Sequence, residues 1–281
     1  MKTSKSSVLK KRPSTFRRLT GLTVEKFDKL LQNLTLLYNE AEEKRLYKPN
    51  RQRAKGAGRK QRLSLEDKLL MLLMYYRLYT THEFLGFIFN FDDSNVGRQI
   101  NYIQPLLAKI FRIPTRRIKL SEEQLLEIFV DATEQQIQRP KRKQKKYYSG
   151  KKKRHTIKNQ IIVNPKGKIL SASESNQGST HDKKLYDKTN IYTDKKSRPI
   201  GDLGYLGVSS IETPIKKPKG KDLTKEQKQF NKKLAKRRIV VEHTIGKMKI
   251  FQILSQRFRN PLSKHSLIFK NVAGIHNLIF A

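Results

Sequence analysis

Leu125-Leu-Glu-Ile-Phe-Val-Asp131 is an apolar run closed by a carboxylate, which is typical of a buried β-strand, and we expect this strand to continue towards Ile137. A second short run, Arg198-Pro-Ile-Gly-Asp202, also ends on an aspartate. A third acid, Glu242, lies within a long helical pattern. Because the chain is otherwise strongly basic, acids at strand ends indicate a chemical role. Binding of hard divalent cations is the role that fits carboxylates best.

The order of elements around these acids predicts an α/β fold in which a mixed sheet is flanked by helices. The first three strands form an antiparallel meander, since Asn164-Pro-Lys-Gly167 has the composition of a turn. A short helix, a fourth strand and two long helices follow. The expected strands cover residues 125–137, 155–163, 168–174 and 198–202, and the expected helices cover 179–187, 224–254 and 263–280.

In a ribonuclease-H-like sheet the first and fourth strands lie side by side. Asp131 and Asp202 would then meet at one sheet edge, and the following helix would bring Glu242 over them. Three converging carboxylates suit Mg²⁺ or Mn²⁺, which prefer oxygen ligands. Two ions about 3.5–4 Å apart could activate an attacking water or 3′-hydroxyl and stabilise the leaving oxygen. We therefore expect these three acids to be both the catalytic residues and the metal ligands.

Each acid also has a purely structural interpretation. The two aspartates could be ordinary strand-end or turn acids, and Glu242 lies four residues after Arg238, which is the spacing of a helical salt bridge. Asp182, which follows the third strand, is a rival for the second metal position. Glu134 lies three residues beyond Asp131, and alternation along a strand places it on the opposite face. We therefore do not expect Glu134 to bind metal.

The amino-terminal part is expected to be helical between basic segments. Residues 2–18 contain seven Lys or Arg and no acid, so we expect a solvated arm. A helix begins after Thr23, with Leu22 and Phe27 at the spacing of a hydrophobic staple. Residues 44–63 contain nine Lys or Arg and no acid and are expected to be a linker.

Three short helices with tight joints then predict a helix-turn-helix. Ser64-Leu-Glu-Asp67 resembles a capping box that opens a helix to about Tyr79, and a second helix ends near Phe89. The third begins at Asp92 and ends before Pro105. In the DNA-binding interpretation the third helix enters the major groove, whereas the alternative is a bundle that only packs on the core. The side chains expected to reach base edges are Asn95, Arg98 and Gln99, with Tyr102 as a further candidate.

The charge balance points to a polyanionic partner. The chain has 62 Lys and Arg against 24 Asp and Glu, a formal net charge of +38, and nucleic acid is the leading candidate. Residues 139–158 contain eleven Lys or Arg and no acid, and could instead be a solvated hairpin. Gly246 and Lys249 follow Glu242 by one and two helical turns, where a DNA backbone could approach. The expected phosphate-binding residues are Lys151, Lys152, Lys153, Arg154 and Lys249.

Composition also excludes several classes of protein. The chain has no cysteine, which excludes disulfides, thiolate zinc sites and cysteine nucleophiles, and its six histidines are scattered. It begins without the apolar segment of a signal peptide, and no run reaches the roughly 18–20 apolar residues of a membrane span. We expect a soluble, cytoplasmic and nucleoid-associated protein without a membrane partner.

Several acid-centred motifs resemble those of the DDE transposases of bacterial insertion sequences, in the IS-five group related to Harbinger-type elements. The resemblance spans roughly residues 20–280, and His243 departs from it because the family often has arginine there. It implies a ribonuclease-H-like catalytic core with Asp131, Asp202 and Glu242 as the triad. The matching pieces are Val130-Asp-Ala-Thr-Glu134, Tyr148-Ser-Gly-Lys-Lys-Lys-Arg-His-Thr156, Gly178-Ser-Thr-His-Asp182, Gly201-Asp-Leu-Gly-Tyr-Leu-Gly207 and Val241-Glu-His-Thr-Ile-Gly-Lys-Met-Lys249.

The resemblance further implies binding to double-stranded DNA at terminal inverted repeats, strand cleavage and transfer into target DNA. A homo-oligomer is expected, because two element ends must be held together. The expected regions are 1–63 (basic arm, helix and linker), 64–118 (helix-turn-helix) and 119–281 (catalytic domain). One alternative is an inactive or repurposed transposase that only binds DNA. A basic RNA-associated protein is another, but it leaves the three acids unexplained.

Overall fold

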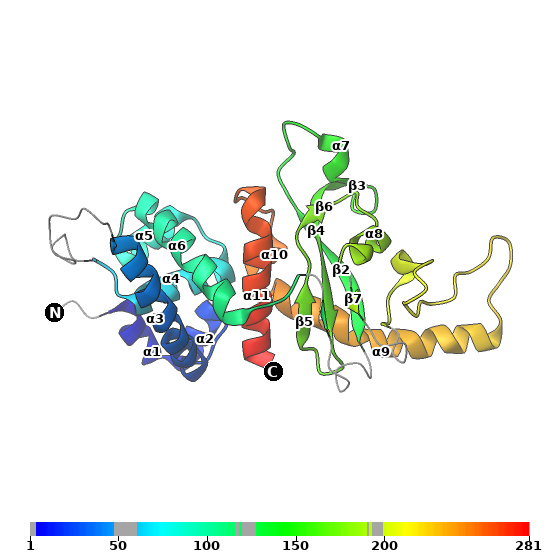
Figure 1. Ribbon diagram of the computed structural model, residues 1–281, viewed down its shortest axis with the longest axis horizontal. Coiled ribbons are helices and arrows are strands. Elements are labelled where there is room, and N and C mark those ends of the chain that lie inside the picture. Colours follow the sequence, from blue (N-terminus) through cyan, green and yellow to red (C-terminus); the bar gives the residue numbers. More distant parts are fainter. Residues whose placement is uncertain are drawn as a thin grey trace. The chain divides into compact units, whose positions relative to one another are not determined.

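The computed structural model describes residues 4–47, 61–115, 118–119, 128–189, 191–192 and 199–280. The chain divides into two compact units (Figure 1). The first comprises Met1–Arg112 with Phe251–Ile253, and the second comprises Ile113–Ile250 with Leu254–Ala281. Most of the expected basic linker and the start of the expected first strand, residues 125–127, lie outside the described residues.

The first unit is built from helices whose starts follow from local sequence. The side chains of Thr23 and Ser64 accept hydrogen bonds from the backbone N–H groups of Lys26 and Asp67, so both expected caps are confirmed. Thr81 and Asp92 cap the next two helices in the same way. The helices are α1 (Lys5–Lys10), α2 (Pro13–Thr20), α3 (Val24–Leu46), α4 (Leu65–Leu78), α5 (His82–Phe89) and α6 (Asp93–Phe111).

The expectation of a solvated arm at residues 2–18 is wrong for its described part, which forms α1 and α2. Phe16 is fully buried, and its ring packs edge-on against Phe27 with centroids 5.1 Å apart. Ser6 donates its backbone N–H to Asp67 Oδ1 at 2.9 Å, so Asp67 bonds α1 instead of completing a capping box. The high lysine content concealed these helices, because long basic side chains keep their charges in water while single apolar residues dock inward.

The third helix of the expected helix-turn-helix does not end before Pro105, as the sequence analysis predicted. It continues as α6 to Phe111 with Pro105 inside it. Leu106 and Leu107, directly after the proline, are buried, as is Ile103 before it. Burial of these side chains offsets the hydrogen bond that proline removes, which explains why the helix continues.

The second unit contains the antiparallel meander that the sequence predicts. Strand β2 (Phe129–Gln136) pairs with β4 (Arg154–Val163), with Asp131 opposite Ile161. Strand β4 then pairs with β5 (Ile169–Ala172), and also with the short strands β3 (Tyr148–Ser149) and β6 (Asn176–Gln177). Two further short strands, β1 (Ile118–Lys119) and β7 (Ile191–Tyr192), pair with each other in parallel.

A parallel segment extends the sheet on the other side of β2. The backbone of Val130 donates to Ile200 O at 3.0 Å, and Ile200 N donates to Ile128 O at 2.8 Å. On its far side, Gly201 N donates to Glu212 O at 3.0 Å. The expected neighbourhood of the first and fourth strands is therefore confirmed, although the fourth is a single bridge at Ile200.

Helices cover both faces of this sheet. Two long helices, α9 (Lys225–Lys249) and α11 (His265–Phe280), pack on one face, as Figure 1 shows. Helix α9 ends earlier than the expected Leu254, and a separate short helix, α10 (Gln252–Ser255), follows. The other elements are α7 (Gln144–Tyr147), α8 (Asp182–Asp187) and the 3₁₀ helices η2 (Leu203–Tyr205) and η3 (Leu262–Lys264). None of the helices in the described ranges is long and apolar enough to cross a membrane.

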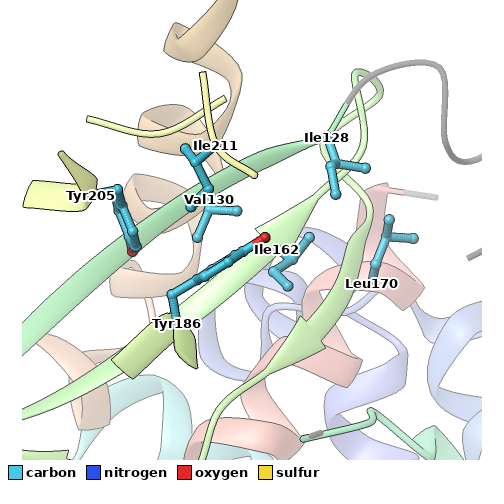
Figure 2. Packing of buried hydrophobic residues seen from close by; sticks show 7 residues of the cluster. All are labelled: Ile128, Val130, Ile162, Leu170, Tyr186, Tyr205 and Ile211. Atoms are coloured by element: carbon cyan, nitrogen blue, oxygen red, sulfur yellow. The ribbon is translucent and has the colours of Figure 1, made fainter. Parts of the chain in front are cut away.

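The opposite face of the sheet carries an apolar cluster that positions α8 and η2 (Figure 2). Val130 of β2 lies directly across from Ile162 of β4, and both side chains contribute to this face. Tyr186 of α8 and Tyr205 of η2 pack together over them, with ring centroids 6.1 Å apart. The cluster consists of Ile128, Val130, Ile162, Leu170, Tyr186, Tyr205 and Ile211.

His265 at the start of α11 predicts a pH dependence of stability. Its buried ring hydrogen-bonds Gln135 Oε1 and Ser175 Oγ, each at 2.8 Å, and burial lowers its pKa from 6.5 to about 3. The folded state therefore binds fewer protons than the unfolded state. The contribution of His265 to the free energy of unfolding is fully present above pH 6.5 and is lost as the pH drops towards 3. We expect a loss of roughly 1.4 kcal/mol per pH unit in that window.

Urea denaturation of the wild type and of His265→Gln between pH 7 and pH 4 measures this effect. The variant should be less stable at pH 7 but should lose less stability on acidification. Equal slopes in the two proteins would show that His265 is not the titrating group.

Candidate active site

Asp131 lies on β2, and the pKa of its carboxyl is raised. Burial, together with the nearby carboxylates of Asp202 and Asp182, raises the pKa of its carboxyl to about 6. The backbone N–H of Ala132, which donates to Asp131 Oδ1 at 2.7 Å, and the charge of Arg238 act in the opposite direction. Asp131 and Asp202 therefore lie close enough to interact, as the sequence analysis expected.

Asp202 directly follows the segment that pairs with β2, and it caps η2. Its Oδ1 accepts a hydrogen bond from Gly204 N at 2.9 Å. A Cβ at Gly204 would lie 2.5 Å from Asp182 Oδ2 and 2.9 Å from Asp202 Oδ1. The two carboxylates thus close around Gly204, and only a glycine leaves room for both. Asp182, the rival in the sequence analysis, is a neighbour of the Asp131–Asp202 pair.

One lysine binds two acids beside this pair. Lys158 Nζ lies 3.0 Å from Asp182 Oδ1 and 3.3 Å from Glu134 Oε1, and its side chain is only 9% exposed. Lys158 lies directly opposite Glu134 in the ladder between β2 and β4. Glu134 also accepts a hydrogen bond from Thr156 Oγ1 at 2.8 Å. Glu134 therefore forms an ion pair with Lys158, whereas the residue opposite Asp131 in the ladder is the apolar Ile161.

Glu242 lies on α9 with an exposed side chain. It is not among the charged groups that shift the pKa of Asp131. Within the described ranges, no group of three or more His, Asp or Glu side chains is arranged to hold a metal ion. The structure therefore brings Asp131 and Asp202 together but does not assemble them with Glu242.

The same helix presents two cations to Asp131. Arg238, one turn before Glu242, lowers the pKa of Asp131, and its buried Nε has no hydrogen-bond partner among the described residues. Burial lowers the pKa of Lys249, as does nearby Lys152, while Asp131 and Glu134 raise it. Sequence reasoning interpreted Arg238 only as a salt-bridge partner of Glu242. The signal that could have placed Arg238 near the site is its spacing from Leu234 and Val241, which puts it on the buried side of α9.

The basic stretch expected to bind phosphates forms a short exposed hairpin next to α7. Strand β3 pairs with the start of β4, Tyr148 opposite His155, and the turn lies between them. Because Lys152 acts on Lys249, this turn lies near the α9 side of the site. The side chains that it exposes are those of Lys151, Lys152, Lys153 and Arg154.

The expected base-reading residues lie on α6 of the first unit. Arg98 is exposed and donates from Nη1 to Asn95 Oδ1 at 2.8 Å, while Asn95 and Gln99 are half-buried. Tyr102 is half-buried. Its ring packs edge-on against Tyr38 of α3 at 5.7 Å, and its hydroxyl is buried. Tyr102 is therefore part of the helix packing and not the base-reading residue that the sequence suggested.

Comparison with known proteins identifies the family of this chain. Residues 130–277, more than half of the chain, match a DDE superfamily endonuclease family. The chain belongs to the DDE superfamily of endonucleases. Residues 61–113 of this DDE endonuclease, which contain α4, α5 and α6, match the helix-turn-helix of DDE superfamily endonucleases.

Two relatives extend the similarity over nearly the whole length. The chain is 35% identical over 270 residues to a probable transposase for insertion sequence element IS702 of Microchaete diplosiphon, covering 93% of each protein. It is 25% identical to a putative transposase for insertion sequence element IS112 of Streptomyces albus G, covering 95% of each. No solved structure matches this DDE endonuclease.

The ion pairs of Lys158 predict a large effect on stability. Lys158→Met would leave the Glu134 and Asp182 carboxylates partly buried without their cation. We expect the free energy of unfolding to fall by about 3 kcal/mol, as when one partner of a buried ion pair is removed. Urea denaturation measures the change, with Lys166→Met at an exposed turn position as the matched control.

Adding Glu134→Gln and Asp182→Asn to Lys158→Met should recover much of the loss, because the unpaired charges are then absent. A loss no larger than that of Lys166→Met would contradict the importance of this pairing.

Proposed function

We propose that this transposase cuts DNA at the terminal inverted repeats of its element and transfers the freed ends into target DNA, using Asp131, Asp202 and Glu242. The observation that carries the proposal is the close pair of Asp131 and Asp202, in which burial and the second carboxylate raise the pKa of Asp131 to about 6. A buried carboxyl with a neighbouring carboxylate is short of positive charge, and a divalent cation supplies it.

The DDE endonuclease family uses divalent metals, and the oxygen-only donor set of this site fits them. We propose Mg²⁺ or Mn²⁺, in two ions held by Asp131, Asp202 and Glu242. When bound, such ions activate the attacking hydroxyl and stabilise the leaving oxygen. Glu242 follows Arg238 by one helical turn and so shares its side of α9, which supports its assignment although its side chain is exposed.

The cations of the chain have a separate task in this proposal. Lys249 and Lys152 lie near one another and near Asp131, so they can bind phosphates on either side of the reacting bond. Gly246, between Glu242 and Lys249, has open space around the position of a Cβ, which permits close approach of a DNA backbone. Residues 151–154 extend this basic surface. These groups bind and orient DNA, and the carboxylates carry the chemistry.

A ribonuclease-H-like catalytic domain over residues 119–281 is the fold that we propose for this chemistry. It is supported by the order of pairing, in which β5, β4 and β2 are antiparallel neighbours and the segment at Ile200 joins β2 in parallel. Glu212 continues the order beyond Ile200. This arrangement explains why two aspartates 71 positions apart in sequence lie together.

We further propose that residues 64–118 recognise the element ends, preceded by the basic region 1–63. Helix α6 would enter the major groove, with Arg98, Asn95 and Gln99 towards the bases. A homo-oligomer would hold two ends together, and the +38 charge favours association with the nucleoid.

A second function, DNA binding without catalysis, is favoured by one observation. Glu242 is exposed and is not grouped with Asp131 and Asp202 in the described part of the chain. A transposase that has lost cleavage but still binds its ends would have the same helix-turn-helix and the same basic surface. Cleavage assays separate the two functions.

The triad predicts a loss of cleavage without a loss of binding. Asp131→Asn, Asp202→Asn and Glu242→Gln should each reduce metal-dependent cleavage of DNA carrying the element ends by on the order of a thousandfold, since metal stabilisation of the transition state is worth several kcal/mol. Gel-shift affinity should stay within about twofold. Asp187→Asn, at an exposed position of α8, is the matched control.

Normal cleavage by any one of the three variants would remove that residue from the site. If the wild type binds the ends and does not cut them with Mg²⁺ or Mn²⁺, the DNA-binding function takes its place.

The two basic surfaces should differ in what they contribute to binding. Arg98→Ala should reduce the preference for element ends over random DNA by about 1–3 kcal/mol, because it removes a base contact. Lys151→Ala should weaken binding to both DNAs alike and lower the salt slope by about one phosphate. Titrations at several salt concentrations measure both, and equal, sequence-independent losses would reject the role of Arg98.

A further inference from the structure

One part of this basic chain has the opposite charge. Residues 78–97 contain no Lys or Arg, and this is the longest such stretch in the sequence. The same residues contain three acids, Glu83, Asp92 and Asp93, and all three are exposed. The stretch forms α5 and the start of α6, in the first unit. Its acids therefore lie on the surface, where they meet any approaching partner.

The same surface is unusually apolar. Phe87 is 80% exposed, more than any other large apolar side chain of the described residues, and Phe84 is 47% exposed. They are separated by three positions on α5, so they lie on one side of the helix. The inner side of α5 is occupied by Leu85 and Phe89, which are buried. The exposed phenylalanines therefore do not contribute to the hydrophobic core of the unit.

The acids of α6 begin close to the phenylalanines of α5 in the fold, because the two helices meet tightly. Phe91 N donates to Gly86 O at 2.8 Å. A Cβ at Gly86 would lie 3.5 Å from Asp93 N, so the start of α6 is next to the centre of α5. We call this surface the α5 face, and it consists of Glu83, Phe84, Phe87, Asp92 and Asp93.

The charge of the α5 face indicates what it binds. Three exposed carboxylates repel DNA phosphates and anionic lipids, and phenylalanine neutralises neither. An apolar centre with an acidic rim is complementary to a protein surface that is rich in Lys and Arg. All 62 Lys and Arg of this chain lie outside residues 78–97, so another copy of the chain offers that surface.

We propose that the α5 face docks onto a lysine- and arginine-rich surface of a second copy of this chain. The two partners use different surfaces, because a contact of the face with itself would bring the two acidic rims together. The inference rests on the proposed function in one respect, since it assigns a contact surface to the homo-oligomer proposed above. Self-association through it requires neither catalysis nor bound DNA.

Sedimentation velocity of the full-length protein over a range of concentrations tests the proposal. The wild type should self-associate, and added salt should weaken the association, because the contact depends on exposed charges. Phe84→Ser/Phe87→Ser should raise the dissociation constant about tenfold or more, as for buried aromatic anchors of an interface. Glu83→Lys should weaken association through the rim.

Leu36→Ser is the matched control, since Leu36 is 67% exposed on α3 of the same unit, outside the α5 face. It should leave self-association unchanged. Circular dichroism and the affinity for a single element end verify that each variant is folded. Loss of association in the double variant, with both of these readouts retained, is the supporting result.

Three outcomes would overturn the proposal. The wild type could remain monomeric up to about 100 μM, a concentration at which even weak interfaces associate. The double variant could associate like the wild type. It could also lose affinity for a single element end while monomeric, which would make the α5 face a DNA contact. None of these outcomes affects the proposed cleavage, which is measured separately through Asp131, Asp202 and Glu242.

Discussion

The pairing of the backbone at Ile200 with the start of β2 is the constraint on which the candidate site depends. Two hydrogen bonds, from Val130 to Ile200 and from Ile200 to Ile128, join segments about 70 residues apart. They bring Asp202 near Asp131, whose pKa is raised first by burial and also by the Asp202 carboxylate. Tyr205, fully buried three residues after Asp202, anchors the turn against the sheet. Without this pairing the two acids would not be neighbours.

Electrostatics divides the acids of this DDE endonuclease into two groups. Glu134 and Asp182 are bonded to Lys158, whose ammonium lies between them. Asp131 interacts electrostatically with Arg238 and Lys249 of α9. Its pKa nevertheless remains raised, because burial and the neighbouring carboxylates outweigh those cations. The first group is balanced by the protein itself. The second, Asp131 with Asp202, lacks a bonded cation among the described residues, and a divalent metal ion would supply the missing positive charge.

Charge is also distributed unevenly over the chain as a whole. The exposed hairpin of residues 151–154 and the side of α9 around Lys249 suit a phosphate backbone. The α5 face, with Phe87 at its centre, is acidic and apolar and suits a protein surface. A strongly basic composition therefore does not make every surface a nucleic-acid surface. Local exceptions of this kind carry more information about partners than the net charge does.

The sequence by itself determined the features that depend on neighbours within a few residues. The caps at Thr23 and Ser64, the meander and the acid-centred motifs all follow from local hydrogen bonding and periodicity. Only the tertiary structure decided that Phe16 is buried, that Asp182 lies beside the aspartate pair, and that Arg238 lies near Asp131. The physical reason is the range of the contacts. A cap joins residues three apart, whereas these contacts join distant segments whose proximity no local pattern encodes.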